Sequence, residues 1–554
     1  MQALSEEHQA AVERRRRIIV NFDVISGDQT FGGRDPEELV AWKFDFIGRE
    51  GTQIDSVWWE WGEGHQAPWP SRTMPLYHQE GYRSWAEAGV DIVQVFLDAS
   101  RDRGVEAFYE YRINGSDNDL GPVQKIPMKE AHPEWLQWTW NANGYWNFAI
   151  EGVRKYKLSI IREIAQRYDV DGIALDFARV CPVLPKGKQW LHRQELTEFM
   201  RGVRSVTEAA ATDRGRPMLV AARVPENLLG CHYDGLDVES WCEEQLVDLL
   251  ALGVRSFDVD IEAFRRIAGP RVRLYPSIDD HHASDGYQTP PVEIYRGAAA
   301  NWWRQGADGI QTFNFNHAMN FPFGSEVAQT HLQCYRELGS ASTLRRKDKV
   351  FVVQRRGGGH GTTVIPNPED WSTPRWMYFN TNMLAPLPID LDVEGRADAM
   401  LTVAVADPVA AEATSVERIE VRLLLSDRAA ADHADGERLE AVTIATIGHN
   451  PQLQNEPPAR SVVDEIELRV NGALLRKPAV EGGWLVFVAA AEHFAVGDNL
   501  IGILSLSGRD SAESPMRVEK LEVHLKYRGN SRSASERRRS GAHQATGSFG
   551  ISLR

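Results

Sequence analysis

Cysteine and long apolar runs are scarce or absent in this sequence. Its 554 residues include four cysteines, Cys181, Cys231, Cys242 and Cys334, and none forms a CxxC pair. This spacing indicates neither a disulfide framework nor a zinc site, and it favours a reducing compartment. No apolar stretch approaches the ~18 residues that span a membrane, so we expect no membrane partner.

Recognisable leader and cofactor motifs are also lacking. Met1–Arg17 has no apolar h-region or small-residue cleavage site, so we expect a cytoplasmic protein, with a periplasmic or secreted location left open. "NFDVISGDQTFGG" does not match GxGxxG, and "RRGGGHGTT" lacks the Gly-Lys-Ser/Thr of a phosphate loop. There is no GxSxG nucleophile elbow either. We therefore expect no nucleotide cofactor and no serine-hydrolase chemistry.

Charge argues against a nucleic-acid partner. The chain has 62 Lys and Arg against 78 Asp and Glu, which gives a net charge of −16. Such a chain is a poor binder of phosphate backbones. The basic runs Arg14–Arg17 and Arg537–Arg539 lie near the termini, where we expect them to be solvent-exposed.

The first 345 residues alternate short apolar runs with helical patterns, which is typical of repeated β-α units. A polar helix is expected over residues 1–16, followed by a barrel over 17–345. Eight strands are predicted: Ile18–Phe22, Ile54–Trp59, Val105–Tyr111, Gly172–Phe177, Met218–Val224, Leu246–Leu252, Val272–Ile278 and Gly309–Phe315. Eight such units in about 300 residues predict a (β/α)8 TIM barrel.

The remainder of the chain has a different texture. After a linker over residues 346–395, alternating strands predict a β-sandwich, jelly-roll-like, over 396–528. The predicted strands are Arg418–Leu425, Glu465–Gly472, Gly483–Ala489, Asn499–Gly508 and Arg517–Tyr527. Residues 529–554 are rich in Ser, Arg and Gly and are expected to form a disordered tail. We expect the sandwich to be structural or to support a homo-oligomer, with glycan binding left open.

The working residues of a barrel enzyme lie where its strands end. Polar or aromatic side chains at these ends are Trp58, Glu60, Glu110, Arg112, Asn114, Asp176, Arg179, Arg223, Glu226, Asp279, Asp280, His281, His282, Asn314 and Asn316. By strand alternation Trp58 and Glu60 share one face, while Trp59 and Trp61 share the other. Of the 17 tryptophans, 14 precede residue 320, which concentrates flat apolar platforms in the barrel.

This inventory suits glycoside chemistry. Cleavage of a glycosidic bond needs one carboxyl group that donates a proton and a second that stays charged. Aromatic faces support the C–H face of a sugar, while Asn, Arg and Glu bind its hydroxyls. Asp176 ends a short apolar strand in "DVDGIALDFAR", so it is the first candidate for the charged carboxylate. A structural pair between Asp176 and Arg179 is the alternative.

Two families share motifs with this region. "HPEWL" (His132–Leu136) and the following "YDVDGIALDFAR" resemble the strand-four region of the glycosyl-hydrolase-like ten family, a likeness that covers residues 17–340. The same strand is similar to "VDGFRLDAA" of the alpha-amylase family. The amylase resemblance implies a nucleophile at Asp176 and an acid/base at Glu226, although Ala174 replaces the arginine of that pattern.

The sequence thus predicts a glycoside hydrolase that acts on a poly- or oligosaccharide. Asp176 is the predicted nucleophile or base, and Glu226, Asp279 or Asp280 the acid. Arg112, Arg179 and Arg223 suggest an acidic or sulfated glycan, because arginine pairs with such anions in a forked geometry. Two alternatives remain: a non-catalytic carbohydrate-binding barrel, and a metal-dependent sugar isomerase or lyase. No metal or cofactor is assigned.

Overall fold

A computed structural model gives the fold of most of the chain. It describes residues 4–24, 34–61, 64–77, 80–114, 126–137, 144–178, 183–253, 256–279, 281–282, 287–288, 290–315, 326–355, 385–392, 394–427, 463–506 and 516–529. None of the helices in these ranges is both long and apolar enough to cross a membrane.

Eight parallel strands close into a barrel in the order β1-β12-β9-β8-β7-β6-β3-β2. They are β1 (Ile18–Asp23), β2 (Ile54–Glu60), β3 (Glu106–Arg112), β6 (Gly172–Asp176), β7 (Leu219–Val224), β8 (Leu249–Leu252), β9 (Arg273–Ile278) and β12 (Ile310–Phe313). The prediction of a (β/α)8 barrel is confirmed, and each predicted strand overlaps one of these.

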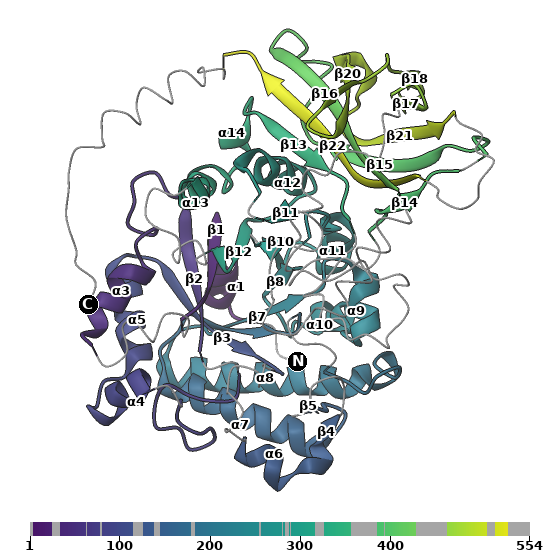
Figure 1. Cartoon of the computed structure of the whole chain (residues 1–554). Helices are drawn as coiled ribbons and strands as arrows, with labels where there is room; N and C mark the ends of the chain where they lie inside the picture. The colour runs from purple at the N-terminus through teal and green to yellow at the C-terminus, as the bar shows by residue number, and fades with distance from the viewer. Residues whose placement is uncertain are drawn as a thin grey trace, which may run out of the picture.

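Helices surround the barrel (Figure 1). They are α3 (Pro36–Lys43), α4 (Glu80–Glu87), α5 (Ile92–Asp102), α6 (Pro127–Ala131), α7 (Glu151–Arg167), α8 (Arg193–Arg214), α9 (Leu228–Asp234), α10 (Val238–Glu243), α11 (Ile261–Ala268), α12 (Val292–Arg304), α13 (Glu326–Glu337) and α14 (Ala341–Leu344). Two short hairpins, β4–β5 (Leu136–Gln137, Tyr145–Trp146) and β10–β11 (His281–His282, Tyr287–Gln288), lie between the barrel strands in sequence.

Alternation along each strand separates two cores. Trp59 and Trp61 of the β2 region point outward and meet the ring of Phe96 on α5 at 5.1 and 5.2 Å. Trp58 points inward and stacks on Phe108 at 5.2 Å, within the apolar cluster that fills the barrel. The expected division of the "WWEW" segment is therefore confirmed.

The N-terminal ends of the strands form what we call the floor of the barrel, and helix α1 (Glu6–Glu13) covers it. Val12 of this helix packs among the inward-facing residues of the barrel. The adjacent Arg16 is 1% exposed and donates from Nε to Glu106 Oε2 at 2.6 Å. The expectation that the whole basic run Arg14–Arg17 is solvent-exposed was therefore wrong, because Arg16 ties α1 to the buried start of β3.

The second domain consists of two antiparallel sheets that enclose their own apolar core. The larger sheet has β13 (Lys349–Val352), β22 (Met516–Tyr527), β16 (Val416–Asp427), β20 (Trp484–Ala489) and β19 (Ala479–Glu481), with β14 (Ile389–Asp390) beside β22. The smaller one has β15 (Ala399–Val405), β21 (Gly497–Ser505), β17 (Ile466–Val470) and β18 (Ala473–Leu474). Strands β13 and β14 fall within the predicted linker, so the sandwich takes up part of that segment.

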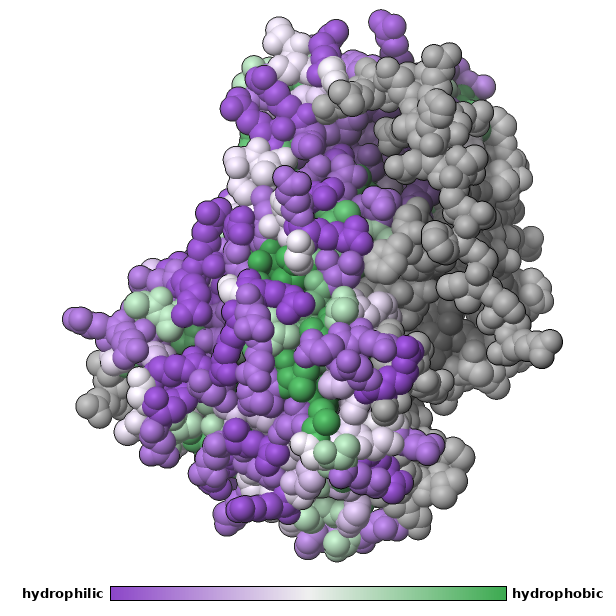
Figure 2. Space-filling model, turned by 90° about the vertical axis from the view of Figure 1, so that its left-hand side faces the viewer, coloured by the Kyte–Doolittle hydropathy of each residue, from purple (hydrophilic) through white to green (hydrophobic). Residues whose placement is uncertain are grey.

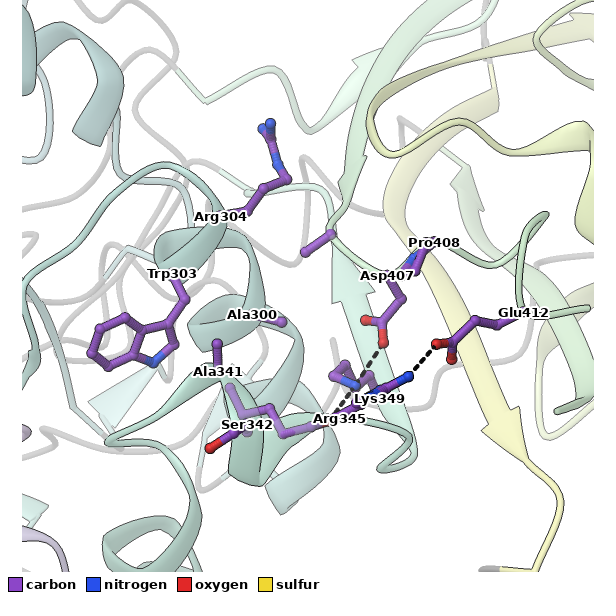
Figure 3. A pocket seen from close by; sticks show the side chains of 12 residues that line it. Ala300, Trp303, Arg304, Ala341, Ser342, Arg345, Lys349, Asp407, Pro408 and Glu412 are labelled. Atoms are coloured by element: carbon purple, nitrogen blue, oxygen red, sulfur yellow. Dashed lines mark hydrogen bonds and ion pairs between the residues drawn. The ribbon is translucent and has the colours of Figure 1, made fainter.

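An ion pair joins the sandwich to the segment that follows α14, where Arg345 contacts Glu412 at 3.1 Å (Figure 3). Within the sandwich, Lys349 of β13 contacts Asp407 at 2.9 Å, and these four residues line a cavity of about 430 Å³ beside α12 and α14. On the face drawn in Figure 2, the coloured surface is mainly hydrophilic and carries a narrow hydrophobic band.

Candidate active site

Charged side chains gather at the opposite end of the barrel, which we call its mouth. Since the strands are parallel, their last residues all lie at this end. Asp23, Glu60 and Glu110 are partners across β1, β2 and β3. Arg112, Asp176 and Arg223 are partners across β3, β6 and β7. Each lies an even number of residues from an inward-facing apolar residue of its strand, so all of them face the barrel interior.

Asp176 and Arg223 form a two-point ion pair. Arg223 donates from Nε to Asp176 Oδ1 at 3.0 Å and from Nη2 to Oδ2. The backbone N–H of Ala178 also donates to Oδ1 at 3.0 Å. Both side chains are almost fully buried. Because hydrogen bonds and a positive charge stabilise the ionised form, this environment favours a charged Asp176.

Glu110 has a different environment. Its Oε1 lies 3.8 Å from Nη2 of Arg223, beyond hydrogen-bonding distance, and its Oε2 has no hydrogen-bond partner among the described residues. Burial raises the pKa of Glu110 well above its usual value, and the charges of Asp176, Glu60 and Asp23 add to this rise while Arg223 opposes it. The mouth thus holds one carboxyl group that favours the proton and one that favours the charge.

A second arginine serves the other two carboxylates. Arg112 donates to Asp23 Oδ1 at 2.5 Å and lies 3.8 Å from Glu60. Burial by itself lowers the pKa of Arg112, but the charges of Asp23 and Glu60 outweigh it and the net shift is upward. Asn314 donates from Nδ2 to Asp23 Oδ2 at 3.0 Å.

Asn314 holds this position in a left-handed backbone conformation. Its φ is 52°, in a region that asparagine tolerates better than most residues. Such conformations cost free energy and often occur at functional sites. Here the conformation places the amide of Asn314, which follows β12, against the carboxylate that ends β1.

The other predicted residues have varied positions. Trp58 lies in the apolar cluster that fills the barrel. Asn114 accepts a hydrogen bond from the backbone N–H of Trp146 at 2.9 Å, so it holds the β4–β5 hairpin. Glu226 and Asp279 are buried just beyond β7 and β9. Arg179, Asp280 and Asn316 lie outside the described residues, as do the side chains of His281 and His282.

Sequence reasoning missed Asp23. The strand-end inventory started at the second strand, although the alternation in "IIVNFD" places Asn21 and Asp23 on the inward face. Phe313 was missed as well, and its ring lies 3.8 Å from the guanidinium carbon of Arg223. The same alternation rule, applied to the first and last strands, was the available signal for both.

The described residues contain no group of three or more His, Cys, Asp and Glu side chains placed to hold a metal ion.

Several solved structures are distantly similar to this chain. No family model matches the chain, and no curated protein does. Among solved structures, the glycoside hydrolase domain of PgaB (BpsB) from Bordetella bronchiseptica is 12% identical, with a TM-score of 0.39, over 59% of this chain and 99% of that one.

Two further solved structures are similar to the same extent. Alpha-L-fucosidase isoenzyme 2 from Paenibacillus thiaminolyticus is 13% identical, with a TM-score of 0.38, over 57% of this chain and 49% of that one. A family 18 N-acetylglucosaminidase from Paenibacillus barengoltzii is 9% identical, with a TM-score of 0.35, over 58% of this chain and 99% of that one.

Proposed function

We propose that this protein is a glycoside hydrolase in which Glu110 donates the proton and Asp176 supplies the negative charge. The observation that carries the proposal is the contrast between two buried carboxyl groups beside one guanidinium. A pair of titratable groups whose surroundings favour opposite protonation states is the pattern expected of an acid and its charged partner.

The chemistry follows from this pair. Glu110 protonates the glycosidic oxygen as the bond to the anomeric carbon breaks, and Asp176 attacks that carbon. Glu110, now ionised, then removes a proton from the water that releases the sugar. Nη2 of Arg223 contacts both carboxyl groups. Their nearest oxygens are therefore closer than the roughly 6.5–9.5 Å of an inverting pair, which supports retention of configuration.

The charge of the mouth favours a neutral glycan. Arg112 and Arg223 are already paired with Asp23 and Asp176, so neither offers a free positive charge to an anionic sugar. An acidic or sulfated glycan, suggested by the arginines in the sequence, has less support from this arrangement. A substrate panel that contains both neutral and acidic or sulfated glycans distinguishes the two possibilities.

The test is sugar release from a panel of neutral, uronic and sulfated glycans by the wild type, Glu110→Gln and Asp176→Asn. Both substitutions keep the size of the side chain and remove the ionisable group. We expect activity on neutral glycans that falls by about 10²–10⁴-fold in Glu110→Gln, the usual contribution of a general acid. Full activity in both variants would exclude this pair.

Three rivals for the acid are measured in the same assay. Glu226, Asp279 and Asp280 are the residues that the sequence favoured, and the variants are Glu226→Gln, Asp279→Asn and Asp280→Asn. We expect each to retain more activity than Glu110→Gln, because Arg223 contacts both Asp176 and Glu110. A larger loss in any of the three would transfer the role of acid to that residue.

A carbohydrate-binding protein without catalysis is the second candidate. The two-point pair between Arg223 and Asp176 neutralises the carboxylate, and a neutralised carboxylate is a weaker nucleophile. If the wild type binds a glycan of the panel, measured by calorimetry, but releases no sugar from it, this candidate replaces the hydrolase.

A further inference from the structure

Arg223 is held on three sides. It projects from β7 beside Asp176, its direct partner on β6, and makes the two-point contact described above. Its guanidinium carbon lies over the ring of Phe313 on β12, 3.8 Å from the ring centroid, and its Nη2 lies 3.8 Å from Glu110 on β3. Strands β7 and β12 are separated in the barrel by β8 and β9. The contact with Phe313 therefore holds the guanidinium from across the mouth, on the side of β12.

In this position, the guanidinium of Arg223 stabilises the ionised form of Asp176 more than that of Glu110. Asp176 receives two hydrogen bonds and the nearby charge, whereas Glu110 receives the charge alone. The charged groups that act on Glu110 are Asp23 on β1, Glu60 on β2, Asp176 on β6 and Arg223 on β7, and Arg112 lies two residues further along the same face of β3. Arg223 donates hydrogen bonds to Asp176 but lies beyond hydrogen-bonding distance of Glu110.

Building on the proposed function, we propose that Arg223 is a positioning residue that assigns the shared proton of the carboxyl pair to Glu110 by keeping Asp176 ionised. Without this arginine, two neighbouring carboxyl groups share one proton and titrate as a coupled pair. A fraction of the protein then carries the proton on Asp176, where it is useless for leaving-group protonation. Both carboxyl groups also lose a stabilising positive charge, so each becomes easier to protonate.

The experiment compares Arg223→Gln and Arg223→Lys with the wild type. Two readouts are recorded as functions of pH: kcat/KM on the best glycan of the panel, and the infrared C=O band of protonated carboxyl groups. The band of Glu110 is identified as the component that disappears in Glu110→Gln. The matched control is Arg204→Lys, because Arg204 makes an equivalent buried pair with Asp248 at the floor.

We expect Arg223→Gln to move both limbs of the pH profile and the Glu110 band upward by about 1–3 pH units, the usual effect of removing an opposite charge. Its kcat should fall at every pH because the proton is misplaced in part of the molecules. Arg223→Lys keeps the charge and loses the fork, so its profile stays closer to the wild type while kcat still falls. Arg204→Lys should lower the melting temperature without moving either readout.

An unmoved Glu110 band in Arg223→Gln would overturn the inference. If that variant does not fold, Arg223→Gln/Asp176→Asn removes both charges of the pair together. We then expect the Glu110 band to move less than 1 pH unit, since loss of the carboxylate offsets loss of the arginine. A larger upward movement would also contradict the inference.

The infrared readout separates this inference from the proposed function. A wild type that releases no sugar, together with a Glu110 band that shifts in Arg223→Gln, overturns the hydrolase and keeps the proton assignment. Activity that depends on Glu110 and Asp176, with no shift of the band, keeps the hydrolase and overturns the role of Arg223.

Discussion

The floor and the mouth of the barrel both bury carboxyl groups, but the two ends differ in how these groups are paired with positive charges. At the floor, Glu106 meets Arg16 in two hydrogen bonds, and Asp248 meets Arg204, His8 and a backbone N–H. At the mouth, Arg112 and Arg223 serve four carboxyl groups, namely Asp23, Glu60, Glu110 and Asp176. Removing one partner of a matched buried pair mainly costs stability. Where carboxyl groups outnumber arginines, the groups differ in how easily they are protonated, so one can hold a proton while another stays charged. Acid catalysis requires such a difference.

The largest effect is expected for a single substitution at the mouth end of β3, compared with a single substitution at the floor end of the same strand. Glu106 and Glu110 share β3 and its inward face, four residues apart. We expect Glu110→Gln to lose about 10²–10⁴-fold in kcat/KM and to keep its stability, because a neutral amide replaces a carboxyl group that favours the neutral form. Glu106→Gln should lose stability and keep kcat/KM when measured below its melting temperature. Equal losses of activity in the two variants would remove the distinction between floor and mouth.

Arg16→Met tests the floor from the other side of its ion pair. The guanidinium donates to Glu106 and to the backbone carbonyls of Ala11, Val12 and Arg14. Leaving Glu106 buried without it should lower the free energy of unfolding by about 3–5 kcal/mol in urea titrations. The control is Arg17→Met, since Arg17 pairs with Asp55 in a partly exposed position, where about 1 kcal/mol or less is expected.

Asp248→Asn should show a pH-dependent loss of stability. Burial by itself raises the pKa of Asp248, but Arg204 and His8 outweigh it and lower the pKa to about 2, from a usual value of 3.8. A carboxyl group whose pKa is lower in the folded protein than in the unfolded chain stabilises the fold at pH values above its unfolded pKa. This stabilisation is lost as the pH falls through the folded pKa. The variant should therefore be less stable by about 2 kcal/mol above roughly pH 4, with the gap closing toward pH 2.

Thermal unfolding between pH 2 and pH 7 measures this gap. Asp213→Asn, at an exposed position of α8, is the control and should track the wild type throughout. A gap for Asp248→Asn that is constant over the whole range would show that its ionisation does not stabilise the floor.

The smallest effect is expected for Asn314→Gly. Glycine relieves the left-handed backbone at φ 52° but loses the hydrogen bond to Asp23. The gain from the relaxed backbone and the loss of the hydrogen bond should nearly cancel in the free energy of unfolding. The value of kcat/KM should fall by about tenfold at most, the equivalent of one ordinary hydrogen bond. Asn471→Gly is the matched control, because Asn471 of the sandwich has a φ of 49°. Its kcat/KM should equal that of the wild type.

Much of the barrel could be predicted from local pattern. Apolar runs of strand length between helical repeats located all eight strands, and the alternation in "WWEW" separated inward Trp58 from outward Trp59 and Trp61. The beginning of the sandwich was harder to locate. Strands β13 and β14 are short, and their partner β22 lies more than 120 residues further along the chain, so only tertiary pairing defines them.

The sequence by itself determined the strands, their inward faces and the presence of polar residues at their ends, because alternation and strand length are local properties. Tertiary structure alone decided which charges meet. The register between β6 and β7 gave Asp176 the arginine of the next strand, and closure of the barrel brought Phe313 onto that arginine. The tertiary structure also places Arg16 at the floor of the barrel, where it pairs with Glu106. Burial and distance between groups that are far apart in sequence set these charges, and neither quantity is encoded in any short stretch of the chain.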